Sequence, residues 1–370
     1  MSSTYGENIR LTIFGSSHGP SVGMTLDGIE AGLPIDMHNL QGFLKRRAPG
    51  NHEYSTSRKE TDLPEFTTGI IDGCTNGERI TAVIQNKDVR SADYSKLSYI
   101  PRPSHADYTA YIKYGKNYDM SGGGKFSGRM TAPLCVAGGL CKEWLEDVGV
   151  SIAAHIISIG TVTIDRDIIS ETSPDLSLIP NDFPVIDPSI AEKMKHEIQK
   201  VKSESDSVGG IIQCIVTGLP TGLGDSLFDG MESRIAKIVF GIPSVKGLSF
   251  GSGFEGSALR GSRNNDAFFV KKGCVYTETN HAGGILGGIT NGMPLIFNVA
   301  IKPTPSIGKP QKSVSLETMT ETTLEIRGRH DPCIVPRAVP VIEAAAAIAV
   351  YDAWLDHFGG IKHGSQQIQK

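Results

Sequence analysis

Apolar and polar positions alternate near the start of the chain, as they do in strands with one buried face. The run IRLTIF at 9–14 has strand composition, and VGMTLDGIEAGLP at 22–34 indicates a second strand that closes on a turn. The apolar period then becomes helical in IDMHNLQGFLKRR at 35–47. This order of strands and helix predicts a unit that mixes α and β structure.

Two longer segments are more apolar and predict buried helices. In TAPLCVAGGLCKEWLEDVG at 131–149 the apolar positions form one stripe, with Thr131 as the expected N-cap and Gly149 as the stop. The run VPVIEAAAAIAVYDAWL at 339–355 contains Glu343 and Asp352 and is too short to span a bilayer. We expect it to be a core helix, with no membrane partner.

The order of strand, turn and helix returns later in the chain. Val22-Gly23 precedes Gly32-Leu33-Pro34 by the same interval as Val208-Gly209 precedes Gly218-Leu219-Pro220, and a helix-like stretch follows each. This indicates two related halves at about 10–150 and 200–350.

No linker rich in Pro or Ser separates the halves, so we expect a single domain over 1–370. In the alignment of the halves Glu204 takes the place of His18, so the chemistry is not duplicated.

The composition limits the partners. A net charge of -4 creates no field that would attract nucleic acid or an anionic membrane, so an acidic ligand needs a local basic cluster. The ten histidines form no H-x-x-x-H or H-E-x-x-H pattern, which argues against a metal. No secretory signal is visible, and the six scattered cysteines predict buried reduced thiols in a cytoplasmic protein.

The stretch FGSSHGPSVG at 14–23 contains G-x-S-x-G, the pattern of a hydrolase nucleophile elbow. An elbow needs a helix after the serine, whereas the residues after Gly19 read as a strand. A serine hydrolase is therefore disfavoured. For His18 two interpretations remain open: a structural role and a functional one.

Several loops carry residues suited to anions. MSGGGKFSGRM at 120–130 could hold an anion with Lys125, Ser127 and Arg129, although Phe126 breaks the Walker pattern. RRAPGNHEYSTSRKETD at 46–62 presents guanidinium groups in a loop. The alternative in both places is a solvated surface.

Three further turns suggest a site. His105 lies in a proline-restricted turn beside Asp107, and GRHDPCIVPRAVPVIEA leads from a charged turn into the core helix. The glycines of NHAGGILGG at 280–288 would let a flat ligand lie on backbone.

Together these segments resemble the chorismate synthase family, in the family's order and over nearly the whole chain. The resemblance rests on FGSSHGPSVG, RRAPG…TSRKETD, NKDVRSADY, RPSHADYTAYIKYG, GGGKFSGRMTA, SVGG…GLPTGLGDSLFD, GIPSVKG, FGSGFEGSALRGS, NHAGGILGGITNG, KPTPSI and GRHDPCIVPRAVPVIEA.

The resemblance implies a fold of the α+β class, a β-α-β sandwich with two pseudo-symmetric halves, assembled as a homotetramer. It implies a carbon–oxygen lyase of the shikimate pathway that makes chorismate from 5-enolpyruvylshikimate 3-phosphate. The reaction is a 1,4-anti elimination of phosphate and requires reduced FMN. Some family members reduce the flavin with NADPH, and these often carry long insertions. This chain has none, so we expect an external flavin reductase.

The resemblance also assigns residues. Catalytic roles fall on His18, His105, Asp331, Ser17 and Ser127. Contacts to the anionic substrate fall on Arg47, Arg129 and Arg329. Flavin contacts fall on Lys125, Phe126, Ser127, Gly287, Lys302, Pro303, Thr304, Pro305, Ser306 and Arg329.

The sequence departs from the family pattern near these positions. Ser16 replaces a glutamate, Ser121 an arginine, and the run containing Phe126 and Met130 also differs; an arginine is missing near Glu53. These changes alter the charge around flavin and substrate, so we expect retained activity with altered affinity. The alternative is a catalytically altered relative that binds flavin.

Overall fold

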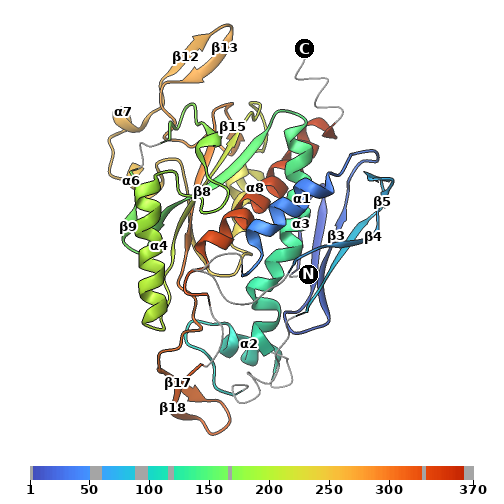
Figure 1. Ribbon diagram of the computed structural model, residues 1–370. Coiled ribbons are helices and arrows are strands. Elements are labelled where there is room, and N and C mark those ends of the chain that lie inside the picture. Colours follow the sequence, from blue (N-terminus) through green and yellow to red (C-terminus); the bar gives the residue numbers. More distant parts are fainter. Residues whose placement is uncertain are drawn as a thin grey trace.

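The computed structural model describes residues 3–50, 61–87, 99–115, 121–165, 169–326 and 331–361, with only the backbone at 121 and 122. Arg329 and Glu53 lie outside the described residues. Two five-stranded antiparallel sheets have the orders β1-β2-β3-β7-β4 and β11-β16-β10-β8-β9 (Figure 1).

The first sheet contains β1 (Thr4–Tyr5), β2 (Arg10–Gly15), β3 (Ser21–Asp27), β4 (Glu65–Thr68) and β7 (Ile80–Gln85). The second contains β8 (Ser151–Ile159), β9 (Val162–Thr163), β10 (Gly210–Thr217), β11 (Val245–Phe250) and β16 (Leu295–Ile301). Smaller pairs are β5 (Ile70–Ile71) with β6 (Cys74–Thr75), β12 (Phe268–Lys271) with β13 (Cys274–Thr277), β14 (Ile285–Leu286) with β15 (Ile289–Thr290), and β17 (Gln311–Ser315) with β18 (Thr320–Leu324).

The helices are α1 (Met37–Arg47), α2 (Asp107–Tyr114), α3 (Thr131–Glu146), α4 (Pro188–Ser203), α5 (Met231–Val239), α6 (Gly253–Gly256), α7 (Gly261–Asn264) and α8 (Val335–Phe358). Helix α3 packs on β3 and β7 of the first sheet, and α8 packs on β8 and β10 of the second. Because α3 and α8 also pack on each other, the layers are sheet, helices, sheet. The predicted α+β sandwich is confirmed.

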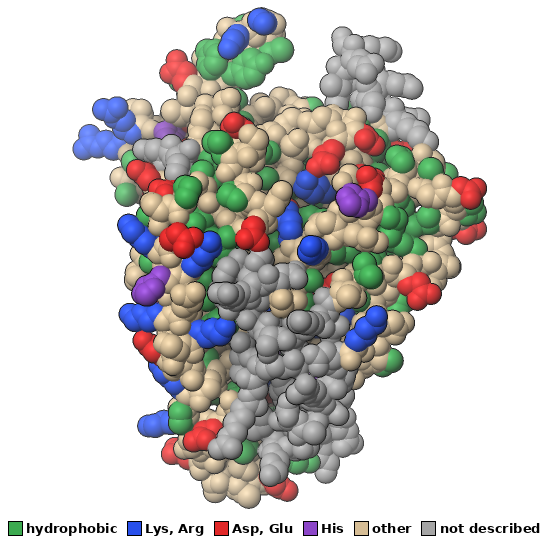
Figure 2. Space-filling model, viewed as in Figure 1, with side chains coloured by type: hydrophobic (Ala, Val, Ile, Leu, Met, Phe, Trp, Pro, Cys, Tyr) green, Lys and Arg blue, Asp and Glu red, His purple; other side chains and the backbone are tan. Residues whose placement is uncertain are grey.

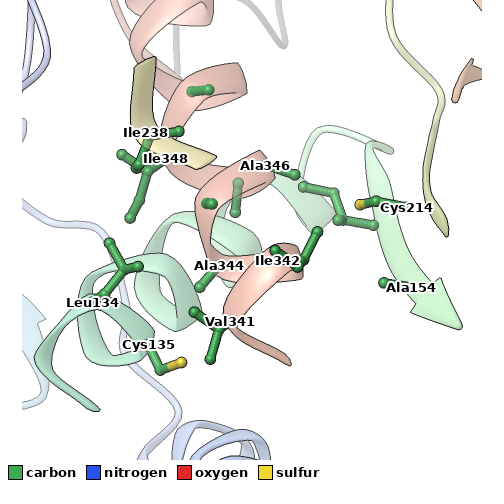
Figure 3. Packing of buried hydrophobic residues seen from close by; sticks show 14 of the residues in the cluster. Leu134, Cys135, Ala154, Cys214, Ile238, Val341, Ile342, Ala344, Ala346 and Ile348 are labelled. Carbon is green, nitrogen blue, oxygen red and sulfur yellow. The ribbon is translucent and has the colours of Figure 1, made fainter. Parts of the chain in front are cut away.

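Both predicted core helices are present. Gly138 allows α3 and α8 to approach closely, since a Cβ there would lie 2.3 Å from the Ala344 Cβ. Figure 3 shows this crossing, with Leu134 and Cys135 facing Val341 and Ala344. Helix α8 is long and apolar enough to cross a bilayer, but 94% of its apolar window is buried in the protein.

The expected N-cap of α3 was wrong by one residue. Met130 occupies the cap position without a side-chain bond, and Thr131 is the first helical residue. The Thr131 hydroxyl instead donates to the Gly128 carbonyl at 2.6 Å, which ties the helix start to the preceding loop.

The division into one domain with two related halves stays a prediction, but two matching turns support it. In the first half, the backbone carbonyl of Thr75 accepts from Gly32 N, and its backbone N donates to Leu33 O. The Thr75 hydroxyl accepts from Leu33 N and donates to Glu30 O. Thr290 makes the same four bonds with Gly222, Leu223 and Pro220.

These bonds match Gly32-Leu33 with Gly222-Leu223, four residues beyond the sequence alignment. The same offset superimposes β3 on β10, the central strand of each sheet. The halves therefore correspond through equivalent strands and turns, in a register that short sequence matches did not show.

Candidate active site

The turn between β2 and β3 carries Ser17 and His18. The side-chain amide of Asn86 donates to the carbonyls of Ser16 and Gly19 at 3.1 and 2.8 Å, which fixes the turn. Ser17 is buried, and its Oγ lies 3.1 Å from His18 Nδ1. Because a strand rather than a helix follows this turn, the disfavoured hydrolase elbow is absent here.

Two arginines meet on one buried carboxylate. Arg47, at the end of α1, and Arg129, in the loop before α3, each donate to a different oxygen of Asp62. Arg47 also donates to Thr131 Oγ1 and to Gly128 O, both at 3.1 Å. Burial raises the pKa of Asp62, but the two guanidinium groups outweigh it and hold this pKa below its usual range.

Arg129 is also bonded to the β2–β3 turn through Asn86. Its Nε donates to Asn86 Oδ1 at 2.8 Å, and its backbone N donates to Ser127 Oγ at 3.2 Å. Asn86 thus bonds both the guanidinium and the turn that carries Ser17.

Asp331 lies just before α8 and pairs with an arginine of that helix. Arg337 Nη1 donates to Asp331 Oδ2, and Arg337 Nε donates to Arg47 O at 3.0 Å. The core helix therefore positions Asp331 beside the end of α1.

His105 occupies the turn before α2, where Arg102 and Asp107 bond its ring. His105 Nδ1 is 2.6 Å from Asp107 Oδ1, and Arg102 Nε donates to Asp107 Oδ2 at 2.7 Å. Arg102 Nη1 also donates to Ser306 Oγ at 3.2 Å, which joins this turn to the segment after β16. Burial raises the pKa of Asp107, but the bonds from Arg102 and His105 lower it well below its ordinary value.

The segment after β16 contributes Lys302, Thr304 and Ser306. The Lys302 ammonium donates to Ser104 O, and the Ser207 hydroxyl donates to Thr304 O at 2.7 Å. Burial and the nearby ammonium of Lys246 lower the pKa of Lys302.

These elements enclose a pocket of about 560 Å³. Its lining contains seven basic side chains: Arg47, Arg102, Arg129, Arg337, Lys125, Lys246 and Lys302. Three carboxylates offset part of this charge: Asp331 lines the pocket, and Asp62 and Asp107 bond three of the arginines. The seven basic groups and three carboxylates among these described side chains therefore leave four positive charges. An apolar wall is formed by Ile242, Val245, Ile334, Ala338 and Val341. Such a pocket suits a polyanionic ligand beside a flat, partly apolar one.

Comparisons with known proteins agree with this site. The family model described as chorismate synthase matches residues 9–355. The chain is 44% identical to a chorismate synthase of Lancefieldella parvula over 365 residues, covering 95% of this chain and 96% of the relative. A chorismate synthase of Methanothermobacter thermautotrophicus is 44% identical over 348 residues, covering 94% and 92%. A crystal structure of chorismate synthase matches with a TM-score of 0.79 and 27% identity, over 98% of this chain and 97% of that one.

The chain belongs to the chorismate synthase family. Membership makes it a lyase of the shikimate pathway that forms chorismate, and the resemblance drawn from its motifs is confirmed.

The pocket gathers most of the residues that the family resemblance assigned. The lining includes Ser17, His105, Asp331, Arg47, Arg129, Lys125, Phe126, Ser127, Lys302, Thr304, Pro305 and Ser306. His18 is not in the lining and adjoins it through Ser17. Pro303 is also outside the lining, and Gly287 lies exposed in the β14–β15 turn.

Sequence reasoning missed three basic residues of the pocket: Arg102, Lys246 and Arg337. Each lies inside a motif that was quoted, namely RPSHAD, GIPSVKG and VPRAVP. The arginines could have been suspected from the carboxylates nearby in sequence, Asp107 and Asp331, which need a counter-charge when partly buried. Lys246 had no such signal, because its neighbour Lys302 is distant in sequence.

The composition also led to expectations about metals and cysteines. Among the described residues no group of three His, Cys, Asp or Glu could hold a metal. All six cysteines are free, but only four are buried; Cys74 is half-buried and Cys274 is exposed.

Proposed function

We propose that this pocket converts 5-enolpyruvylshikimate 3-phosphate to chorismate with reduced FMN as cofactor. The observation that carries the proposal is the convergence of seven basic side chains with Ser17, His105 and Asp331 around one pocket. A substrate with two carboxylates and a phosphate needs such a cluster, since the chain as a whole is acidic.

The pocket fits both ligands. Arg47, Arg129 and Arg337 can hold the substrate's anionic groups with N–H donors that the internal carboxylates leave unused. Lys125, Ser127, Lys302, Thr304 and Ser306 supply donors for the flavin, and the apolar wall suits its ring system. When bound, reduced FMN supplies the electron density that allows phosphate to leave. Phe126, Pro303, Pro305, Gly287 and Arg329 remain proposed contacts.

The acid–base groups then have distinct tasks. His18 can deliver a proton toward the departing phosphate through the Ser17 hydroxyl, because His18 Nδ1 and Ser17 Oγ are 3.1 Å apart. His105 would hold a proton at the flavin's edge, and Asp331 would help to remove the ring proton. Ser127 orders the loop by accepting from Arg129 N.

The departures from the family pattern at Ser16, Phe126 and Met130 leave this constellation in place, and the side chain of Ser121 lies outside the described residues. Ser16 Oγ accepts from Gly19 N at 3.1 Å, so this serine supports the turn that carries His18. We therefore expect activity with altered flavin or substrate affinity, rather than a relative that only binds flavin.

Anaerobic turnover with dithionite-reduced FMN tests the proposal, with chorismate absorbance as the measurement. The wild type should form chorismate, and His105→Ala should lower kcat on the order of 100-fold, as loss of a general acid does. No product from wild-type protein that binds FMN would favour the flavin-binding alternative.

For the assembly we propose a homotetramer, supported by an exposed apolar hairpin. The β12–β13 hairpin projects from the body (Figure 1), and Figure 2 shows apolar side chains gathered on it. Phe268, Val270 and Val275 share one face, and Phe269 and Tyr276 the other, so both faces need a cover.

Val270→Asp should reduce the molar mass measured by light scattering. Val314→Asp, at an exposed position of the separate β17–β18 hairpin, is the matched control and should leave the mass unchanged. Equal masses for both variants and the wild type would contradict a role of this hairpin in assembly.

We also propose cytoplasmic residence and dependence on an external flavin reductase. The free cysteines are compatible with a reducing compartment. Purified protein should reduce FMN with NADPH at a negligible rate, and addition of a flavin reductase should restore turnover. A substantial NADPH-to-FMN rate with the protein alone would contradict this.

A further inference from the structure

The turn that presents His105 also contains two charged residues that bond its ring. Asp107 Oδ1 lies 2.6 Å from His105 Nδ1 and accepts from Arg102 Nη2 at 2.8 Å. Asp107 Oδ2 accepts from the backbone N and the Nε of Arg102, at 2.9 and 2.7 Å. Oδ2 therefore accepts from two donors of Arg102, whereas Oδ1 accepts from one donor of Arg102 and faces the His105 ring nitrogen.

These contacts decide which ring nitrogen carries the proton. Arg102 Nη2 lies 3.1 Å from His105 Nδ1 and could donate to it if this nitrogen were unprotonated. In that case the lone pair of Nδ1 would lie 2.6 Å from Asp107 Oδ1, whose own lone pairs would repel it. A proton on Nδ1 removes that repulsion and makes a strong bond to the carboxylate. In the neutral ring Nε2 is then unprotonated.

The surroundings leave Nε2 accessible. A Cβ at Gly123 would lie 3.2 Å from this nitrogen, so the glycine keeps space beside it, and His105 lines the pocket. Asp107 itself stays ionised, because the bonds from Arg102 and His105 lower its pKa more than burial raises it.

We propose that Asp107 is a positioning residue that holds the proton of His105 on Nδ1, so that Nε2 exchanges protons in the pocket. Arg102 fixes both carboxylate oxygens and offsets their charge. The carboxylate stabilises the imidazolium formed when Nε2 takes up a proton, and the guanidinium limits that stabilisation so that the proton can be returned. The catalytic consequence rests on the proposed function.

Asp107→Asn should reverse the tautomer. The amide oxygen must take the Oδ2 position, where it accepts from Arg102 N and Nε, so the amide NH₂ faces His105 Nδ1. Nδ1 then becomes an acceptor, and the ring proton moves to Nε2.

Solid-state NMR of ¹⁵N-histidine-labelled protein without ligands measures this directly, with His105→Gln to assign the signals. The wild type should carry the neutral-ring proton on Nδ1, and Asp107→Asn should carry it on Nε2. Asp27→Asn, which alters an exposed pair with Arg79, should match the wild type. An Nε2-protonated wild-type ring, or an unchanged tautomer in Asp107→Asn, would overturn the proposal.

Kinetics add a readout that a merely structural role would not produce. Asp107→Asn should lower kcat by about 10-fold or more while KM changes by less than about 2-fold. In a His105→Ala background the same change should lower kcat no further, and an additional large loss would show that Asp107 acts elsewhere. Because the NMR measurement needs neither flavin nor substrate, failure of the lyase activity leaves the tautomer result readable.

Discussion

The pocket holds its basic side chains in two different ways. The arginine cluster (Arg47, Arg129 and Arg337) is bonded to carboxylates of the protein, Asp62 and Asp331. The lysine pair (Lys246 and Lys302) has no carboxylate bonded to it among the described residues; Lys302 donates only to the Ser104 carbonyl. The arginine cluster is therefore held in place without a ligand, whereas no carboxylate of the described residues neutralises the charge of the lysine pair.

The difference follows from the two side chains. A guanidinium has five N–H donors in a rigid plane, so Arg47 can bond Asp62, Thr131 and Gly128 and keep donors for a ligand. An ammonium is a compact charge on a flexible stem and suits a phosphate without a fixed geometry. We therefore expect the arginine cluster to orient an anionic ligand and the lysine pair to attract it.

Removal of the shared carboxylate should have the largest effect. Asp62→Asn leaves two guanidinium groups without their counter-charge at a buried position, which should cost about 3–5 kcal/mol of unfolding free energy. Urea denaturation measures it. Asp27→Asn is the control, and its exposed pair should give no measurable change. Equal midpoints for the two variants would mean that Asp62 does not stabilise the arginine cluster.

Loss of a lysine should affect binding and leave stability intact. Lys302→Met should weaken FMN binding by about 10-fold, because a charge-assisted bond is lost, and should reduce the dependence of affinity on salt. Fluorescence titration of FMN measures both effects. Lys195→Met, at a surface pair with Glu192, should bind FMN normally. Unchanged affinity in Lys302→Met would remove this residue from the flavin site.

Acid should weaken the arginine cluster by a smaller amount. The pKa of Asp62 is lower in the folded protein than in the unfolded chain, so its stabilisation is complete above the unfolded value of about 3.9 and declines as pH falls through the folded value. The stability gap between wild type and Asp62→Asn should therefore stay constant from about pH 7 to pH 5 and shrink as the pH falls below about 4. Urea midpoints across this range test the sign, and a widening gap would contradict it.

The fold was predictable where one segment carries its own signal. The apolar run of α8 and the alternation of β2 and β3 are local patterns that burial preserves. The register of the two halves was not predictable, because the glycine-leucine pair occurs twice in GLPTGLG. Hydrogen bonds from Thr290, far along the chain, select the second pair.

The candidate site shows the same division. His105 and Asp331 were predicted as site residues from their motifs, and both line the pocket; their acid–base roles stay a prediction. Arg102, Lys246 and Arg337 became visible only when the pocket was assembled. His18 was expected in the site, but it is not in the pocket lining and is joined to it by its contact with Ser17, which is.

The sequence by itself determined the family, the reaction class and the core helices, since periodicity and motifs are properties of neighbouring positions. Only the tertiary structure decided how charges are paired. Asp62 joins arginines from α1 and the loop before α3, and the fold brings Lys246 of β11 near Lys302, which follows β16, so that two like charges adjoin. Electrostatic interaction depends on distance in space and on burial, and neither quantity can be read from positions along a chain.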